Sequence, residues 1–397
     1  MTIDHPRTVL LGHLVAGGQI SYGIVQPGNH EPTGVPIVRV GDIRDGRISV
    51  DRPLKVGQEI ADRHLRTRLH GGELLVSLVG TVGEAAIVPK SMTGWNVARA
   101  VAVVKVIDVE AEWIRRFLQT RDARNYLESV LNTTVQATLN LSDLKRLPIA
   151  MPDHQTRMAI TEVLGALDDK IAVNSQVHRV ADELLAAVLQ RYIAEGDGTT
   201  GKLGDIAIVN GVAITPLSEG NLRYVDIASV DVGRFEIPES SAWQEAPSRA
   251  RRCIRRGDTL WSTVRPNRRS HALNLSRDPS LVGSTGLAVL TSRDSHFAFL
   301  YESTKLPEFT EYLESAAEGS AYPAVRADRF VGAPVPNLSV AARSEFESIA
   351  APMREHLHSL GTESQALSTL RDTLLPQLMS GKLRVKDAEK QLEDVVK

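Results

Sequence analysis

The most constraining feature of this 397-residue chain is an internal repeat. Leu127-Glu128-Ser129 recurs as Leu313-Glu314-Ser315, and Pro148 recurs as Pro334, in both cases 186 residues further on. Earlier pairs drift slightly, as Gly72-Glu73-Leu74-Leu75 does against Gly257-Asp258-Thr259-Leu260, which indicates small changes of loop length inside one conserved unit. Two copies of a unit in one polypeptide predict a pseudo-two-fold molecule with two similar but non-identical binding faces.

Composition narrows the class of protein. The chain is 42% hydrophobic and too long for one ordinary core, so we expect two packed domains with connectors. No apolar run approaches the roughly 20 residues of a membrane span, and the first residues lack the pattern of a secretory signal. Cys253 is the only cysteine, which excludes internal disulfides and a thiolate-rich zinc site. We therefore expect a cytoplasmic protein.

The sequence patterns predict an α+β fold for each copy. Residues 1–152 and 196–337 contain short β-branched runs separated by Gly and Pro, which is typical of strands. A helix is expected late in each of these domains, near 112–130 and near 298–317. Residues 382–397 form a tail after the second copy.

Each domain is followed by a segment that predicts a long helix, over 153–195 and 338–381. Apolar residues recur at three-four spacing, which predicts that the two helices pair as an antiparallel coiled coil. Asn174 and Ser364 interrupt the apolar stripes, so we expect them to fix register or to mark a partner contact. The predicted seam consists of Ile160, Val163, Leu167, Ile171, Val177, Ala181, Leu184 and Val188 in the first helix, and of Phe346, Ile349, Met353, Leu357, Leu360, Leu367, Leu370 and Leu374 in the second.

Catalytic motifs are missing or incomplete. The segment 196–202 resembles a phosphate-binding loop, but Leu203 stands where that loop needs a hydroxyl. Asp168-Asp169-Lys170 resembles part of a nuclease motif, but it lies inside the predicted helix, where a solvated face is expected. No glycine-rich nucleotide turn and no metal-ligand cluster is present. We predict a chain without an active site and without a metal.

Two strand-turns are the best candidates for a binding surface. The segment 72–83 and its counterpart 257–269 each end in a turn with hydroxyls, glycines or basic side chains. Loops at 132–136 and 319–323 follow in the two copies. Turns of this composition can present backbone N–H groups and Arg to phosphates, or Arg and Asn to base edges.

The chain resembles the DNA-specificity (S) subunit of type I restriction-modification systems. The C-terminal run from Leu374-Leu375-Pro376-Gln377 through Leu383-Arg384-Val385 carries the resemblance, together with the two strand-turns, Leu141-Ser142-Asp143-Leu144 and the segment 283–290. It implies two target-recognition domains that read a bipartite site in double-stranded DNA, and two spacer helices. It also implies docking of two methyltransferase subunits that bind S-adenosylmethionine, and possible addition of restriction subunits that use ATP.

The resemblance and the turn chemistry together give a set of candidate DNA contacts. The first turn has fewer arginines than the second, which is a departure between the two copies. Two alternatives stay open, a single-chain restriction-methylation enzyme and a repeat scaffold that binds only protein. The candidate residues are Arg39, Ser77, Thr81, Arg99, Thr134 and Gln136 in the first copy, and Ser262, Thr263, Arg265, Asn267, Arg268, Arg269, Ser284, Thr285 and Tyr322 in the second.

Overall fold

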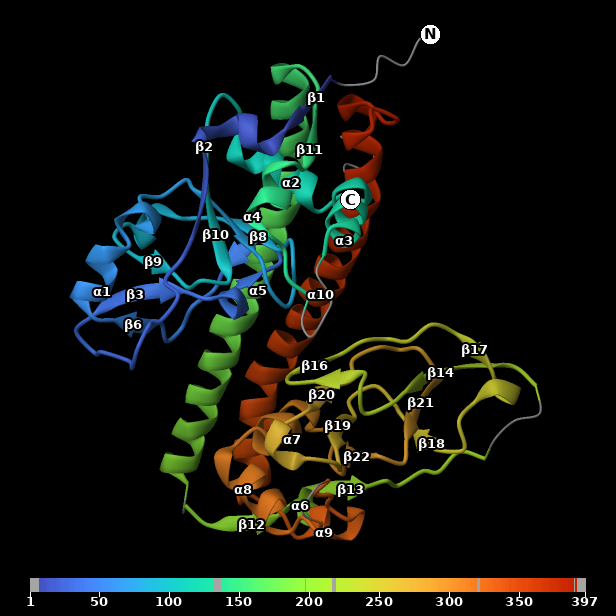
Figure 1. The fold of residues 1–397 in the computed structure, drawn as a ribbon. Helices are drawn as coiled ribbons and strands as arrows, with labels where there is room; N and C mark the ends of the chain where they lie inside the picture. Colours follow the sequence, from blue (N-terminus) through green and yellow to red (C-terminus); the bar gives the residue numbers. More distant parts are fainter. Residues whose placement is uncertain are drawn as a thin grey trace. The chain divides into compact units, whose positions relative to one another are not determined.

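The computed structural model divides the chain into two compact units (Figure 1). The first contains Met1–Ile171 and Ala366–Lys397, and the second contains Ala172–Gln365. The described residues are 7–131, 137–196, 198–215, 219–319, 322–388 and 390. Each unit mixes strands and helices, which confirms the predicted mixed α and β content.

The first unit is built on an antiparallel sheet in the order β2-β10-β7-β8. Its centre is apolar, since all four residues of β7 and the first four of β10 are buried. A smaller sheet, β6-β3-β9, and the pair β1-β11 complete the unit. The strands are β1 (Arg7–Leu10), β2 (Val15–Tyr22), β3 (Val35–Val38), β6 (Leu54–Val56), β7 (Leu74–Ser77), β8 (Ala85–Ile87), β9 (Asn96–Val97), β10 (Val101–Val106) and β11 (Pro148–Met151).

The second unit repeats this topology. Its main sheet has the order β13-β22-β19-β20, its second sheet the order β17-β14-β21-β18, and β12 pairs with β23. Ser262 lies opposite Leu287 as Ser77 lies opposite Val101, so register is repeated as well. The strands are β12 (Thr200–Lys202), β13 (Ala207–Val209), β14 (Asn221–Val225), β17 (Ser241–Ala242), β18 (Ala250–Cys253), β19 (Thr259–Ser262), β20 (His271–Leu273), β21 (Leu281–Ser284), β22 (Leu287–Ser292) and β23 (Pro334–Pro336).

The single late helix predicted in each domain is wrong in detail, because each copy has a pair of helices. Thr120 separates the first pair, and its hydroxyl accepts the amide N–H of Ala123 as an N-cap. Pro307 separates the second pair, since proline suits the first position of a new helix. The helices are α2 (Ala111–Leu118), α3 (Arg121–Ser129), α7 (Phe297–Thr304) and α8 (Pro307–Ser315).

Short elements connect these parts. The first unit has β4 (Ile43–Arg44), β5 (Arg47–Ile48), α1 (Gln58–Arg63) and α4 (Leu141–Lys145), and the second has α6 (Leu203–Ile206), β15 (Val230–Asp231), β16 (Arg234–Phe235) and α9 (Ala327–Val331). Beyond the last long helix, Ala388 is buried in the core of the first unit.

The two long helices are α5 (His154–Glu195) and α10 (Val340–Met379). Asp153 and Ser339 cap them as predicted, accepting the amide N–H groups of Thr156 at 2.9 Å and Ala342 at 3.2 Å. Both helices contribute to both units, so the predicted domain boundaries stay a prediction. Within the described residues, neither helix nor any other is apolar enough over sufficient length to cross a membrane.

The two helices pair within each unit. In the first unit, Leu164 and Leu374 belong to one buried cluster with the domain core. In the second, Leu189 of α5 and Phe346 of α10 share a buried cluster, while Asn174 of α5 bonds near residues 360–364 of α10. Since rising numbers on α5 meet falling numbers on α10, the helices are antiparallel in this unit.

The buried seam of α5 differs from the predicted one. Val177 and Leu184 are 38% and 51% exposed, and Ile349 of α10 is 39% exposed. The buried face keeps its seven-residue spacing from Leu167 to Asn174 and continues to Leu185 and Leu189. The prediction followed apolar residues, whereas the middle of the true seam is polar.

Asn174 is the centre of this polar section. It is 3% exposed, and its Nδ2 donates to Oε2 of Glu363 at 2.7 Å and to Oγ of Ser364 at 3.1 Å. A buried amide that pairs only in one alignment fixes the register of two helices. Asn174 and Ser364, which were expected to fix register or to mark a partner contact, contact each other, and this contact favours the register role.

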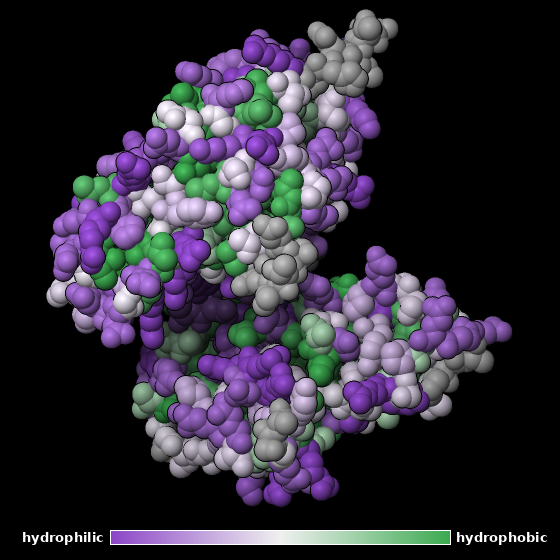
Figure 2. Space-filling model, viewed as in Figure 1, coloured by the Kyte–Doolittle hydropathy of each residue, from purple (hydrophilic) through white to green (hydrophobic). Residues whose placement is uncertain are grey.

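Hydrophilic residues cover most of the face in Figure 2, and apolar residues appear there in small patches. This distribution is ordinary for a protein surface, so exposed apolar residues carry meaning only where they share one face of an element.

Adjacent leucines of α5 provide a direct test of the corrected seam. Leu185→Ala should lower the free energy of unfolding by about 2–5 kcal/mol, because Leu185 is 0% exposed and its removal leaves a cavity. Leu184→Ala should change it by less than about 0.5 kcal/mol. Urea unfolding of both variants measures the difference, and equal losses would contradict the assigned seam.

Candidate nucleic-acid interface

The turn between β19 and β20 contains two arginines with left-handed backbone. Residues Pro266–Arg268 form a 3-10 turn, flanked by Arg265 with φ 52° and Arg269 with φ 55°. Left-handed backbone costs about 1–2 kcal/mol for a side chain other than glycine. Such strain persists only where surrounding contacts hold the chain, and it is frequent at functional sites.

A second loop is bonded to this turn. The amide of Arg265 donates to the carbonyl of Pro323 at 2.7 Å, and that of Val325 donates to Thr263 at 2.8 Å. The guanidinium of Arg265 lies over the ring of Tyr322, 4.5 Å from its centroid, and Tyr322 is 71% exposed. The structure therefore brings together the two segments that sequence analysis selected separately.

Three further candidates lie on the outside of this turn. Asn267, Arg268 and Arg269 are exposed, and so is Thr285 at the end of β21. We call the group of exposed Asn267, Arg268, Arg269 and Tyr322, together with half-buried Arg265, the second recognition surface. We call Thr81, Glu84 and the segment 40–45 of the first unit the first recognition surface.

The predicted serines are not part of a surface. Ser77, Ser262 and Ser284 are 0%, 5% and 3% exposed. The hydroxyl of Ser77 donates to the carbonyl of Thr81, and that of Ser262 donates to Val264 at 3.0 Å. Ser284 Oγ accepts the amide N–H of Gly286 at 3.1 Å, so these serines shape turns. They are removed from the candidate contacts.

Thr263 is also committed to the fold. Its hydroxyl donates to the carbonyl of Gly286 at 2.9 Å. Because the same threonine accepts the amide of Val325 through its backbone, it joins the recognition turn to the neighbouring loop.

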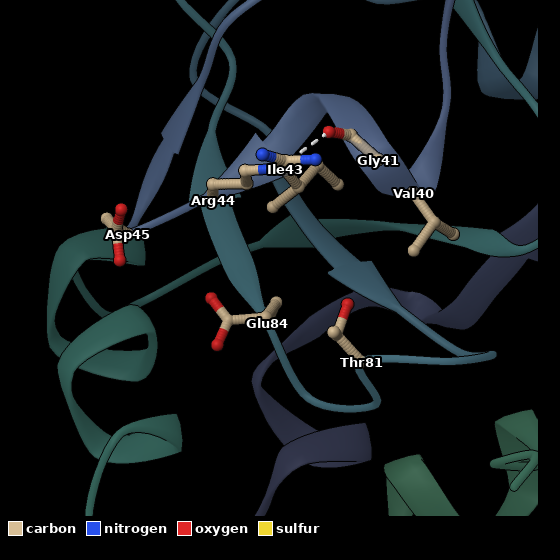
Figure 3. A pocket seen from close by; sticks show the side chains of 7 residues that line it. All are labelled: Val40, Gly41, Ile43, Arg44, Asp45, Thr81 and Glu84. Atoms are coloured by element: carbon tan, nitrogen blue, oxygen red, sulfur yellow. Dashed lines mark hydrogen bonds between the residues drawn. The ribbon is translucent and has the colours of Figure 1, made fainter. Parts of the chain in front are cut away.

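The first unit has a corresponding turn between β7 and β8. Thr81 and Glu84 lie on it, opposite the segment 40–45, and together they line a cavity of about 320 Å³ (Figure 3). Thr138 pairs with Val79 at the start of this turn, as Ala324 pairs with Val264 in the second unit. Thr134 and Gln136 lie outside the described residues.

The other first-unit candidates are separate from this cavity. Arg39 is half exposed and lies 3.5 Å from the carboxylate of Asp42. Arg99 is exposed, and its amide donates to Ile24 at 2.8 Å. Neither residue is among those that line the cavity with Thr81.

Sequence analysis missed Arg44, Asp45 and Glu84, which line the same cavity (Figure 3). Asp45 has φ 50°, the left-handed backbone of a tight turn, and Asp45-Gly46 is a common turn dipeptide. That dipeptide was the available signal, although only the fold places it beside Thr81.

A buried cluster of aromatic side chains contacts the second recognition surface at Arg269. His271 is 2% exposed, stacks on Trp261 with a centroid distance of 5.0 Å, and lies 5.6 Å from the ring of Tyr301. Its Nδ1 is 2.6 Å from the carbonyl of Arg269, a contact in which the neutral ring donates. Burial lowers the pKa of His271 to about 4, and the charges of Lys305 and Arg269 act in the same direction.

Ionic side chains are buried where the first domain meets its helices. Arg116 of α2 is 1% exposed and lies 2.5 Å from Asp168 of α5, which also binds Arg371 of α10 at 2.9 Å. Burial raises the pKa of Asp168, but the neighbouring arginines outweigh it and hold the pKa below its usual value. The expected solvated face is therefore wrong for Asp168, although Asp169 is exposed.

The second unit contains a corresponding cluster. Glu302 of α7 is buried and accepts from Arg354 of α10, whose Nε is 2.6 Å from Oε1 of Glu302. Asp182 of α5 accepts from Arg354 at 2.6 Å and from Lys305 at 2.9 Å. Burial raises the pKa of Asp182, but Arg354 and Lys305 outweigh it and lower the pKa.

No group of His, Cys, Asp and Glu with the arrangement of a metal site occurs in the part of the chain that the structure describes. The chemistry available at both recognition surfaces is hydrogen bonding, charge and stacking. The fold and these surfaces define a protein with two related turn-and-loop faces, each supported by the same pair of helices.

Known proteins with similar sequences are specificity subunits of type I restriction enzymes. Residues 26–180 match the family model of the type I restriction modification DNA specificity domain. The specificity subunit of the Escherichia coli type I restriction enzyme EcoBI is 26% identical over 189 residues, which cover 47% of this chain and 39% of that subunit. The HindI specificity subunit of Haemophilus influenzae is 21% identical over 64% of this chain and 73% of its own length.

A solved structure shows the same fold. The S subunit of a type I restriction-modification system from M. genitalium aligns with a TM-score of 0.59 at 13% identity, over 94% of this chain and 95% of that one. The chain is similar to type I restriction-modification specificity subunits in the sequence of residues 26–180 and in fold, and this is the resemblance that its sequence motifs indicated.

The burial of neutral His271 predicts a pH effect on stability. Between pH 6.5 and about 4 the unfolded chain binds a proton that the folded chain excludes, so the free energy of unfolding falls as pH is lowered. The loss attributable to His271 is up to about 3 kcal/mol. We expect the stability difference between wild type and His271→Phe to shrink from pH 7 to pH 4 in urea unfolding. A constant difference would contradict a neutral, buried His271.

Proposed function

We propose that this chain is the non-catalytic, DNA-reading subunit of a type I restriction-modification complex. The observation that carries the proposal is the duplication of one turn-and-loop surface on one topology, with different side chains in each copy. Two different readers in one chain suit a bipartite site with two unlike half-sites. In this proposal the antiparallel pair of α5 and α10 acts as the spacer that separates the two domains.

The second recognition surface has the chemistry of base and phosphate contact. Arg268 and Asn267 are exposed side chains of the types that pair with guanine and adenine edges in the major groove. Tyr322, with Arg265 over its ring, adds an exposed aromatic face. We expect weak, salt-sensitive binding by the chain alone, because a net charge of −2 provides little general attraction to phosphates.

Partners complete the proposed assembly in the cytoplasm. In this proposal two methyltransferase subunits bring S-adenosylmethionine and perform the chemistry. Restriction subunits that use ATP are further partners of the proposed complex. The support within this chain is an exposed stripe on α5, formed by Val173, Val177, Val180 and Leu184, which are 58%, 38%, 48% and 51% exposed. Four apolar residues on one helical face fit a partner's apolar groove or helix.

Methylation mapping tests the function. The chain is co-expressed with the methyltransferase subunit encoded beside it, and the DNA is read for new methyladenine. A single motif of two short half-sites with an unspecified gap is the expected result. New methylation by the chain alone would favour the single-chain enzyme, and co-purification without any methylation would favour the protein-only scaffold.

Arg268→Ala tests direct reading in the second unit. We expect relaxed preference at one base of one half-site, with a loss of roughly 1–3 kcal/mol in discrimination, because a bidentate contact to a base edge is removed. Binding of the complete complex to duplexes substituted one base at a time measures it. Equal weakening on every duplex would instead make Arg268 a phosphate contact.

Val180→Asp with Leu184→Asp tests the docking stripe. The two charges should reduce co-purification of the methyltransferase subunit at least tenfold, because they would be buried against an apolar partner. Ala186→Asp is the matched control, since Ala186 is exposed on another side of the same helix. Equal loss in the control, or no loss in the double variant, would exclude the stripe as the docking site.

A further inference from the structure

The strained turn of the second recognition surface needs contacts that hold it. Arg269, with φ 55°, has three: its amide donates to Pro266 at 2.9 Å, its carbonyl accepts from His271, and its guanidinium donates to the carbonyl of Lys305 at 2.7 Å. The last contact is with a residue outside the hairpin. It places Lys305 directly against the recognition turn.

Lys305 also contacts the helix pair. It follows the last residue of α7, and its Nζ donates to Oδ1 of Asp182 on α5 at 2.9 Å and lies 3.1 Å from Oε2 of Glu302. Arg354 of α10 joins the same two carboxylates. Lys305 thus touches the turn with its backbone and the helices with its side chain.

The buried cluster of aromatic side chains makes a parallel connection. Tyr301 is 2% exposed, and both Lys305 and Arg354 lie over its ring, at 5.4 and 4.9 Å from the centroid. His271, which donates to the carbonyl of Arg269, lies beside the same ring, with a centroid distance of 5.6 Å. The helix pair and the recognition turn are therefore joined by continuous side-chain contact inside one unit.

We propose that Lys305 is a positioning residue through which α5 and α10 hold the second recognition turn in its reading conformation. The proposal rests on the proposed DNA-reading function and names a residue that does not touch DNA. Its consequence is specific: the charge network of the helices sets the discrimination of one half-site and leaves the other unchanged.

A purely structural role is the competing explanation. Glu302 and Asp182 are balanced by Arg354 and Lys305, so Lys305→Met leaves one buried carboxylate without its counter-charge. Glu302→Gln combined with Lys305→Met restores the balance of charge and keeps an oxygen that accepts from Arg354. The double variant still lacks the Lys305–Asp182 contact. It therefore separates loss of positioning from loss of charge balance.

The experiment uses the complete complex and duplexes that carry the motif found by methylation mapping. One half-site is altered at a time, and the half-site affected by Arg268→Ala identifies the one that the second unit reads. We expect Lys305→Met and the double variant to lose roughly tenfold in discrimination at that half-site only. Lys202→Met, which removes one exposed lysine of the same unit, is the control and should match wild type.

Amide hydrogen exchange provides a readout without DNA. Residues 265–271 should exchange faster in both Lys305 variants than in wild type or in Lys202→Met. Restored discrimination and restored protection in the double variant would overturn the proposal in favour of charge balance. Unchanged discrimination and protection in Lys305→Met would overturn it outright. Absence of any methylation motif would instead mean that the DNA-reading function itself fails.

Discussion

The burial of charged side chains between each domain and the long helices is the constraint on which both units depend. Arg116 and Glu302 occupy equivalent positions of the repeat, and so do Asp168 and Arg354. In each case the sign of the charge is reversed. A buried ion must be paired, and removal of its partner is strongly destabilising. The short helices α2 and α7 therefore each fit only the long-helix charges of their own unit. If the two sets of charges were exchanged, Arg116 would face Arg354, and two like charges would be buried together.

The polar middle of the helical seam has a second consequence. On α5, Asn174 is buried in a position that a leucine would otherwise occupy, and half-buried His178 and Asp182 follow it at intervals of four residues. The apolar residues of this section lie instead on another face, where Val177 and Leu184 meet solvent. A helix that uses polar groups for register and keeps its apolar groups outside is suited to a further partner. The seam predicted from the sequence followed the apolar residues, and for this reason it lay on the wrong face of this section of α5.

The sequence was sufficient for whatever depends on local pattern. Spacing located the repeat, and the cap residues Asp153 and Ser339 located the helix starts, because capping is a contact between near neighbours. Burial of Ser262 and Asp168 could not be predicted, since it depends on segments over twenty residues away in the chain. The Arg265–Tyr322 stack likewise needs two loops to meet. The sequence therefore gives the types of side chain in each turn, whereas the burial of each side chain follows only from the three-dimensional structure.

The two recognition surfaces differ in whether their side chains donate or accept hydrogen bonds. In the second unit the side chains of the recognition surface are mostly donors, namely exposed Arg268 and Arg269 and half-buried Arg265. In the first, Asp45 and Glu84 place carboxylate acceptors around the cavity beside Thr81. Under the proposed function, arginines favour the acceptor edge of guanine, and carboxylates accept from the amino group of cytosine. One topology thus supports two readers of unlike bases, since the turn sequences vary while the strands that carry them keep their register.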